Sequence, residues 1–119
     1  MILIVDDDAT VARAQARLLR SLGHETHCIQ EGAGAVDYAV QHEPDLIVLD
    51  LAMPDMHGID VLKALKADPG TASIPVVVCS ASLDPLDRGR ALAAGAAEYA
   101  EKLRADWNEI VNRLLPPTA

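Results

Sequence analysis

Three carboxylates, one hydroxyl and one ammonium group each lie at the end of a short apolar segment of the sequence. These residues are Asp6, Asp7, Asp50, Ser80 and Lys102. Ligands of open α/β sheets bind beyond the carboxyl ends of the strands, so these side chains are expected at one edge. Neighbouring carboxylates repel unless a cation joins them or some are protonated, and Mg²⁺ is the expected cation because it prefers oxygen ligands and often shares its shell with a phosphate. The pattern therefore predicts phosphoryl transfer, with the Lys and Ser side chains donating to phosphoryl oxygens.

Short apolar segments alternate with helical patterns along the chain. The first segment, ILIV, is apolar throughout, as in a parallel strand that is covered on both faces. Strands are expected at 2–5, 24–30, 45–49, 74–79 and 97–101, and helices at 9–22, 33–41, 59–65, 86–94 and 107–114. This alternation predicts one α/β domain at 1–115, a parallel sheet with helices on both faces. Residues 116–119 are expected to be a tail or the start of a linker.

The first helix has recognisable ends and a possible core face. Asp8 directly precedes it and can cap its N-terminus, where a carboxylate meets free N–H groups. Gly23 is expected to end it. The predicted buried stripe is Val11, Ala14, Leu18 and Leu22, and that of the last helix is Trp107, Ile110, Val111 and Leu114.

Neither the cysteines nor the histidines predict a site. Cys28 and Cys79 fall in separate predicted strands, where each is expected to be a buried thiol, and we expect no disulfide. His24 and His27 are three positions apart in an extended segment, so they would point to opposite faces. The other two histidines lie in loop or turn sequences, and we expect no histidine-bound metal.

The net charge of −8 argues against some classes of partner. Nucleic acids and anionic membranes are bound by clustered Lys and Arg, so we expect no direct contact of this domain with nucleic acid. No apolar run approaches the roughly 18 residues of a membrane span. The first residues also lack the basic region of a signal peptide. We therefore expect a cytoplasmic protein without membrane insertion.

Four motifs together resemble those of one protein family. VDDD at 5–8, VLDLAMPDMHG at 48–58, VVVCSA at 76–81 and EYAEK at 98–102 are similar, in order and spacing, to the motifs of response regulator receiver domains of two-component systems. The resemblance covers essentially the whole chain, and the combination is far more specific than any one motif. It implies a flavodoxin-like fold with strand order 2-1-3-4-5 and a phosphorylatable signalling switch, which is not an enzyme beyond its own phosphotransfer and autodephosphorylation.

The resemblance also implies the residues of the phosphorylation site. Asp50 would accept the phosphoryl group from a histidine kinase or a histidine phosphotransfer protein, and Lys102 would contact that group. The implied Mg²⁺ ligands are Asp6, Asp7, Asp50 and the backbone carbonyl of Ala52.

A second set of implied roles concerns the response to phosphorylation. Ser80 would bond a phosphoryl oxygen once Asp50 is modified, and Tyr99 would be the aromatic switch. A downstream partner protein would bind the face made by the fourth helix, the fifth strand and the last helix.

The sequence departs from the family pattern after Lys102, where members usually carry a Pro joined by a cis peptide. A cis bond before a non-Pro residue costs roughly 2.5–4 kcal/mol, so we expect a trans peptide to Leu103 and a reshaped loop. Ala52 and Ser82 stand where family members tune hydrolysis of the phosphoryl group. Because Ala52 cannot orient a water and Ser82 is short, we expect a long-lived acyl phosphate.

Two other functions stay open on the sequence alone. DDDATV at 6–11 also resembles the nucleophile motif of haloacid dehalogenase phosphatases, with Asp6 as nucleophile and Asp8 as general acid. Against this, Asp50 precedes Ser80, whereas the remaining acidic motif of that superfamily comes last, and the chain is short for a substrate-selecting cap. The other alternative is a phosphorylation-independent adaptor on a receiver fold.

Overall fold

The strands form one parallel sheet whose spatial order differs from their order in the chain. The computed structural model describes residues 1–51, 53, 57–81, 84–102 and 104–115. The strands are β1 (Ile2–Val5), β2 (Thr26–Ile29), β3 (Leu46–Asp50), β4 (Val76–Ser80) and β5 (Glu98–Glu101). They pair in parallel in the order β2-β1-β3-β4-β5, which confirms the predicted topology. The partly polar β2 lies at an edge of the sheet.

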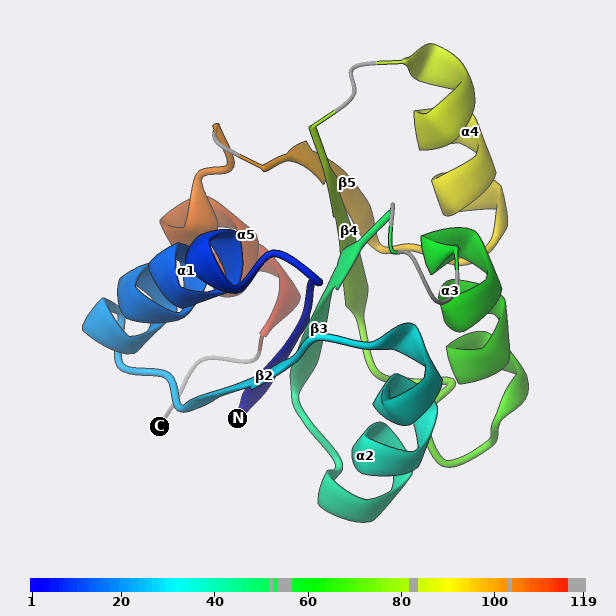
Figure 1. Cartoon of the computed structure of the whole chain (residues 1–119), viewed down its shortest axis with the longest axis horizontal. Helices are drawn as coiled ribbons and strands as arrows, with labels where there is room; N and C mark the ends of the chain where they lie inside the picture. Colours follow the sequence, from blue (N-terminus) through cyan, green and yellow to red (C-terminus); the bar gives the residue numbers. More distant parts are fainter. Residues whose placement is uncertain (52, 54–56, 82–83, 103, 116–119) are drawn as a thin grey trace.

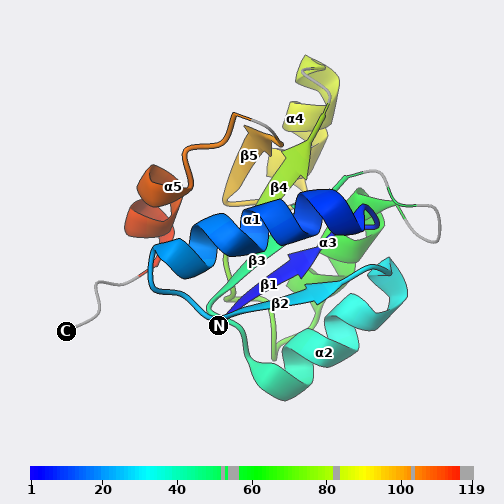
Figure 2. The ribbon, with the colours of Figure 1, turned by 60° about the vertical axis from the view of Figure 1, so that its left-hand side comes forward.

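Helices cover both faces of the sheet, as predicted. They are α1 (Ala9–Ser21), α2 (Ala35–His42), α3 (Gly58–Ala67), α4 (Pro85–Ala93) and α5 (Trp107–Leu114), with a short 3₁₀ turn (Gly32–Gly34) before α2. Figure 1 shows α1 and α5 on one side of the sheet and α2, α3 and α4 on the other. In Figure 2, α1 crosses in front of the strands, and α2 is seen below them. None of the helices in the described ranges is long and apolar enough to cross a membrane.

The core consists of two layers because alternate strand residues point to opposite faces. Ile47 and Leu49 of β3 join the layer under α2, α3 and α4, whereas Leu46 and Val48 join the layer under α1 and α5. All four side chains are at most 1 % exposed. Whether a residue stands at an odd or an even position of its strand therefore decides which of the two core layers it joins.

α1 begins and ends where the sequence predicts. The Asp8 carboxylate accepts hydrogen bonds from the backbone N–H groups of Thr10 and Val11, at 2.9 and 3.2 Å, which confirms it as the cap. After Ser21 the chain turns through Gly23, whose φ of +95° is in the left-handed region that favours glycine.

The predicted buried face of α1 is wrong. Leu18 and Leu22 are 54 % and 39 % exposed. The helix instead buries Ala12, Gln15, Ala16 and Leu19. Both stripes have helical spacing, but the small alanines allow the helix to lie close to the sheet. The buried stripe also contains a polar Gln, which conceals it from a search for apolar residues. The predicted stripe of α5 is correct, with Trp107, Ile110 and Val111 all buried and Leu114 packed against them.

The cysteine prediction is half correct. Cys79 in β4 is a buried thiol, but Cys28 is exposed because β2 is an edge strand. Both are free thiols, and burial raises the pKa of Cys79 to about 12. The predictions for Ala52, Ser82, the Lys102–Leu103 peptide and the tail at 116–119 lie outside the described residues.

Candidate functional site

Strand parity brings the predicted charged residues together. Ile4 in β1 and Val48 in β3 face α1 and α5, so Asp6 and Asp50, two positions further on, continue on the same side. Asp50 ends β3, while Asp6 directly follows β1, its neighbour in the sheet. Parallel strands end at the same edge, so residues distant in sequence meet there.

Lys102 joins two of these carboxylates. Its Nζ lies 3.0 Å from Oδ2 of Asp6 and 3.1 Å from Oδ1 of Asp50. Both carboxylates are almost fully buried, at 2 % and 4 % exposure, and the lysine side chain is 13 % exposed. Buried charges are retained only when they are paired, because removing an ion from water is costly. The sequence predicts that Asp6, Asp50 and Lys102 lie close together, and the structure shows direct ion pairs between the lysine and both carboxylates.

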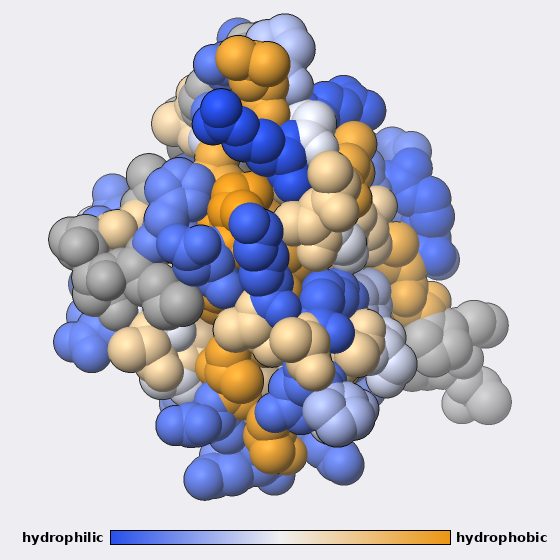
Figure 3. Space-filling view, turned by 90° about the vertical axis from the view of Figure 1, so that its right-hand side faces the viewer, coloured by the Kyte–Doolittle hydropathy of each residue, from blue (hydrophilic) through white to orange (hydrophobic). Residues whose placement is uncertain are grey.

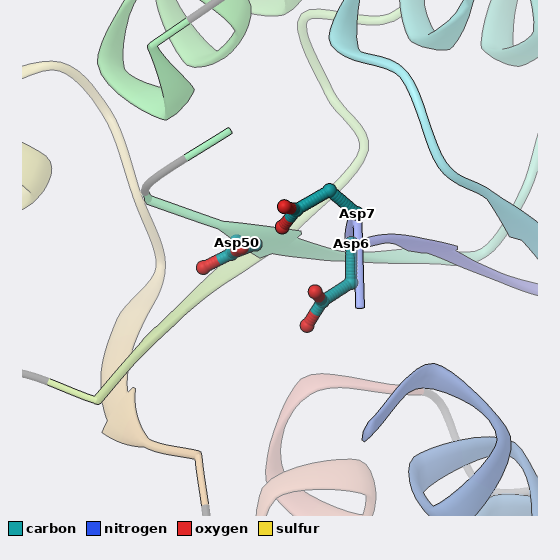
Figure 4. A group of neighbouring side chains, drawn as sticks. All are labelled: Asp6, Asp7 and Asp50. Carbon is teal, nitrogen blue, oxygen red and sulfur yellow. The ribbon is translucent and has the colours of Figure 1, made fainter. Parts of the chain in front are cut away.

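Asp7 completes a group of three carboxylates at this edge. Figure 4 shows Asp6 and Asp7 beyond the end of β1, with Asp50 at the end of β3. One oxygen from each carboxylate lies within 4.8 Å of the others. Asp7 can approach because β1 has ended and the chain bends there, and the Asp6 carboxylate is held by the Asp8 N–H at 2.9 Å. Three adjacent oxygen donors of this kind fit a hard divalent cation such as Mg²⁺.

The electrostatics of the edge reflect both burial and crowding. Burial first, and then the Asp6 charge, raise the pKa of Asp50 to about 6, although Lys102 opposes the shift. Burial lowers the pKa of Lys102, but its bonds to Asp6 and Asp50 outweigh this effect and raise the pKa overall. Lys102 thus remains a cation at neutral pH. Asp50 is ionised there too, but its charge is much less stable than that of an ordinary aspartate.

Ser80 lies at the same edge, and Tyr99 lies inside β5, before that edge. Ser80 ends β4 and is 6 % exposed. It stands one position beyond Cys79, the register partner of Asp50. Tyr99 is the register partner of Val78 and packs against the layer under α2, α3 and α4. By strand parity the Ser80 side chain points to this same layer, so the two predicted switch residues share a face.

One residue of the site has no role in the sequence prediction. Gly58, the first residue of α3, donates its N–H to the Leu51 carbonyl at 2.8 Å. A Cβ at this position would lie 2.4 Å from the Asp50 carbonyl oxygen and 2.7 Å from Cα of Leu51. Gly58 therefore allows α3 to approach the backbone that carries Asp50. The available signal is a glycine at the end of the loop that follows Asp50, directly before the predicted helix.

Comparison with known sequences identifies the family. Residues 2–114 match the family described as the response regulator receiver domain. The transcriptional regulatory protein KdpE of Mycobacterium tuberculosis is 41% identical over 102 residues, which cover 86% of this chain and 44% of that protein. The DNA-binding response regulator MtrA of Mycobacterium leprae is 41% identical over 101 residues, or 85% of this chain and 44% of that protein. The chain thus spans less than half the length of these relatives.

Solved structures agree with this result. The receiver domain of a signal transduction histidine kinase from Syntrophus aciditrophicus has a TM-score of 0.86 and 35% identity, covering 96% of this chain and 88% of that one. The chemotaxis protein CheY4 of Vibrio cholerae has a TM-score of 0.89, with 96% of this chain and 97% of that one covered; at 23% identity it supports the fold alone. From sequence, topology and acidic edge together, this chain belongs to the response regulator receiver family of two-component signal transduction.

Proposed function

We propose that Asp50 accepts a phosphoryl group and that the chain is a phosphorylatable signalling switch. The observation that carries the proposal is the Lys102 ammonium, which bonds both Asp6 and Asp50 at the carboxyl edge of a receiver domain. A cation beside the acceptor can donate hydrogen bonds first to the carboxylate and then to the oxygens of an incoming phosphoryl group. The phosphoryl donor is a histidine kinase or a histidine phosphotransfer protein.

In the proposed step, an oxygen of Asp50 attacks the phosphorus of a phosphohistidine. An O–P bond forms and the N–P bond breaks, and the imidazole nitrogen leaves with the electron pair and is then protonated. Lys102 exchanges a carboxylate contact for a phosphoryl oxygen, so its charge stays paired. Most of the catalysis is positioning and charge neutralisation.

Asp6, Asp7 and Asp50 are the proposed ligands for Mg²⁺, together with the backbone carbonyl of Ala52, which lies outside the described residues. When bound, the ion would supply positive charge that offsets the charge of these carboxylates and of an incoming phosphoryl group. The chain itself orients Asp6 through the Asp8 N–H and holds Asp50 at the end of a buried strand. Both features fix the carboxylate oxygens in place before a phosphorylated partner binds.

Ser80 and Tyr99 are the proposed switch residues. Ser80 would donate its hydroxyl to a phosphoryl oxygen, and Tyr99 would respond from the same face of the sheet. The proposed output surface is α4, β5 and α5, where Leu86 of α4 is 66 % exposed and Arg113 of α5 pairs with Glu98 of β5. Figure 3 shows the side of the molecule that carries α2, α3 and α4, where apolar and charged side chains are interspersed; α4 is the part of the proposed output surface that lies on this side.

The test is acceptor mapping with acetyl phosphate and Mg²⁺. Wild type is expected to gain the mass of one phosphoryl group, located on Asp50 by peptide mass spectrometry, and Asp50→Asn should lose it. Asp37→Asn, which removes an exposed carboxylate on α2, is the matched control and should label like wild type. Labelling of Asp50→Asn at wild-type level would contradict the proposal.

Asp6→Asn and Asp50→Asn separate the two alternatives. A dehalogenase-type phosphatase would hydrolyse an external ester such as p-nitrophenyl phosphate and would lose this activity in Asp6→Asn. A phosphorylation-independent adaptor would bind its partner equally well with Asp50→Asn. Family membership favours the receiver function over both.

The long lifetime of the acyl phosphate also remains a proposal. Ala52→Asn would add a polar group able to orient an attacking water, so it should speed the loss of the phosphoryl group. Decay of the labelled protein in Mg²⁺ buffer measures this directly. An unchanged or slower decay would remove the support that Ala52 gives to this proposal.

A further inference from the structure

The outer edge of β2 carries backbone groups that the sheet does not use. β2 pairs with β1 alone, so its other side is an edge of the sheet (Figure 2). The carbonyls of Glu25 and Ile29 accept hydrogen bonds from N–H groups of the segment 2–6. Because bonding residues alternate along a strand of a parallel pair, the backbone groups of Thr26 and Cys28 point away from the sheet. Such groups are a template for pairing with another extended chain.

A stripe of arginines runs along α1 beside this edge. Arg13, Arg17 and Arg20 are spaced by four and three residues, so they share one face of the helix. All three are exposed, and α1 contains no acidic residue. Among the residues that the structure describes, none of the three forms an ion pair with a carboxylate. The stripe is therefore a local concentration of positive charge in a chain whose net charge is −8.

Two of these arginines lie beside β2. Sγ of Cys28 is 3.9 Å from the carbonyl oxygen of Ala12, so the strand lies against this side of α1. Burial raises the pKa of Cys28 and the charge of Arg20 opposes the shift, which places Arg20 near the strand. Arg13 lines a hollow of about 510 Å³ together with residues 28–31, at the end of β2. Positive charge thus flanks the backbone groups of Cys28 that point outward.

The charge of this surface selects its partner. Two copies of the chain joined through antiparallel β2 strands would bring both sets of arginines to one face, where like charges repel. An extended segment with acidic side chains at alternate positions avoids this repulsion. Its backbone can bond Thr26 and Cys28. Its acids recur about every 6.6 Å on one face, within reach of arginines that span about 10 Å along α1, from Arg13 to Arg20.

We propose that the outer edge of β2 is a docking site for an extended acidic segment of a partner protein, which adds to the sheet as a further strand. The backbone bonds provide affinity, and the arginines select acidic side chains. Glu31 also lines the hollow at the end of β2. It disfavours an acid at that end and so helps to fix the register of the added strand.

The direct test uses a short labelled peptide in which glutamate alternates with valine. Its fluorescence anisotropy is expected to show saturable binding to the wild-type chain, and the binding should weaken as salt screens the charges. Hydrogen exchange of the Cys28 backbone N–H, followed by NMR, should slow when the peptide is bound. A peptide with lysine in place of glutamate should not bind, and equal binding of the two peptides would overturn the proposal.

N-methylation of the peptide separates backbone pairing from attraction between charges. One version carries N-methyl groups on all its glutamates and the other on all its valines. In a paired strand only one of these sets directs its N–H groups at β2, so one version should lose binding and the other should retain most of it. Equal binding of the two versions would overturn the proposal, because charge alone does not distinguish them. This comparison uses wild type and does not depend on how any variant folds.

Variants of the stripe test the role of the arginines. Arg13→Gln and Arg20→Gln should each weaken binding of the acidic peptide about two- to fivefold, as expected for an exposed ion pair. Arg88→Gln removes the same charge from the exposed surface of α4 and is the matched control, which should bind like wild type. Equal weakening in all three variants would overturn the proposal. So would displacement of the peptide by an oligonucleotide as readily as by unlabelled peptide, or dimerisation of the chain that excludes the peptide.

Discussion

Leu49 and Asp50 are neighbours in β3, and both are almost fully buried, yet burial has opposite consequences for them. Leu49 is 0 % exposed and packs into the layer under α2, α3 and α4. Asp50 is 4 % exposed, and burial raises its pKa to about 6. Removing the leucine from water favours folding, whereas removing the carboxylate from water opposes it.

This contrast separates the sheet into two regions. The interiors of β1, β3 and β4 are uninterrupted apolar residues that stabilise the fold, and the carboxyl edge carries charges that the fold must compensate. At that edge Lys102 compensates two carboxylates at once. A costly arrangement that persists in a folded chain indicates a function, here the proposed phosphoryl site. Substitutions in the two regions should therefore differ in sign as well as in size.

The largest effect is expected in the strand interior. Leu49→Ala leaves a cavity in the core and should lower the free energy of unfolding by about 2–5 kcal/mol, as measured by urea denaturation. Leu18→Ala is the control, since Leu18 is 54 % exposed, and it should change stability by less than about 0.5 kcal/mol. Equal losses in the two variants would show that Leu18 contributes as much to the core as Leu49.

The next effect lies where the two regions meet. In Gly58→Ala, the new Cβ would lie 2.4 Å from the Asp50 carbonyl oxygen, so either α3 or the end of β3 must move. We expect a loss of about 1–3 kcal/mol, typical of overpacking, together with weaker acetyl phosphate labelling of the folded protein. Gly89→Ala in α4, where a Cβ would meet nothing within 4 Å, should leave labelling unchanged and stabilise the helix by up to about 1 kcal/mol. Normal labelling of Gly58→Ala would show that the close approach does not position Asp50.

The sequence predicts the strands and the acidic edge better than it predicts helix faces. A buried parallel strand is recognisable because it is apolar throughout, and the position of an acid directly after it needs no knowledge of packing. The face of α1 is different, because two stripes of helical spacing compete. Leu18 and Leu22 are the more hydrophobic choice, but Ala12 and Ala16 are the ones that allow close approach to the sheet.

Two residues escape prediction for related physical reasons. The importance of Gly58 comes from a distance across space, between the start of α3 and the end of β3, which no local pattern encodes. Gln15 is polar and was expected on no buried face, yet it is 3 % exposed. Cys28 shows the opposite error, since an apolar residue of a strand is exposed when that strand lies at an edge.

Asp50→Asn should raise stability, in contrast to the loss in Leu49→Ala. The folded pKa of Asp50, about 6, is above the ordinary 3.8, so wild type loses stability as pH rises from about 4 to 6, while Asn does not titrate. In metal-free buffer, the variant should gain about 1–3 kcal/mol over wild type across this window and keep the difference at higher pH. Urea denaturation at a series of pH values measures the gain. A difference between the two proteins that does not change with pH would contradict the assigned cause.

The smallest expected effect is the stabilisation of the fold by Mg²⁺ at the carboxyl edge, where it would reduce the difference between the two regions. If Asp6, Asp7 and Asp50 hold Mg²⁺, binding should compensate part of their cost, and Mg²⁺ at ten times its dissociation constant should stabilise the fold by about 1.4 kcal/mol. The gain should shrink at pH 5, because the raised pKa of Asp50 leaves it mostly protonated there. Thermal unfolding with and without Mg²⁺, at pH 8 and pH 5, measures this. Asp7→Asn should reduce the gain at pH 8, whereas Asp37→Asn, which removes a carboxylate from α2, should keep it. A gain that is the same at both pH values and in both variants would mean that the ion binds elsewhere, and the charges at the edge of the sheet would then need another compensating partner.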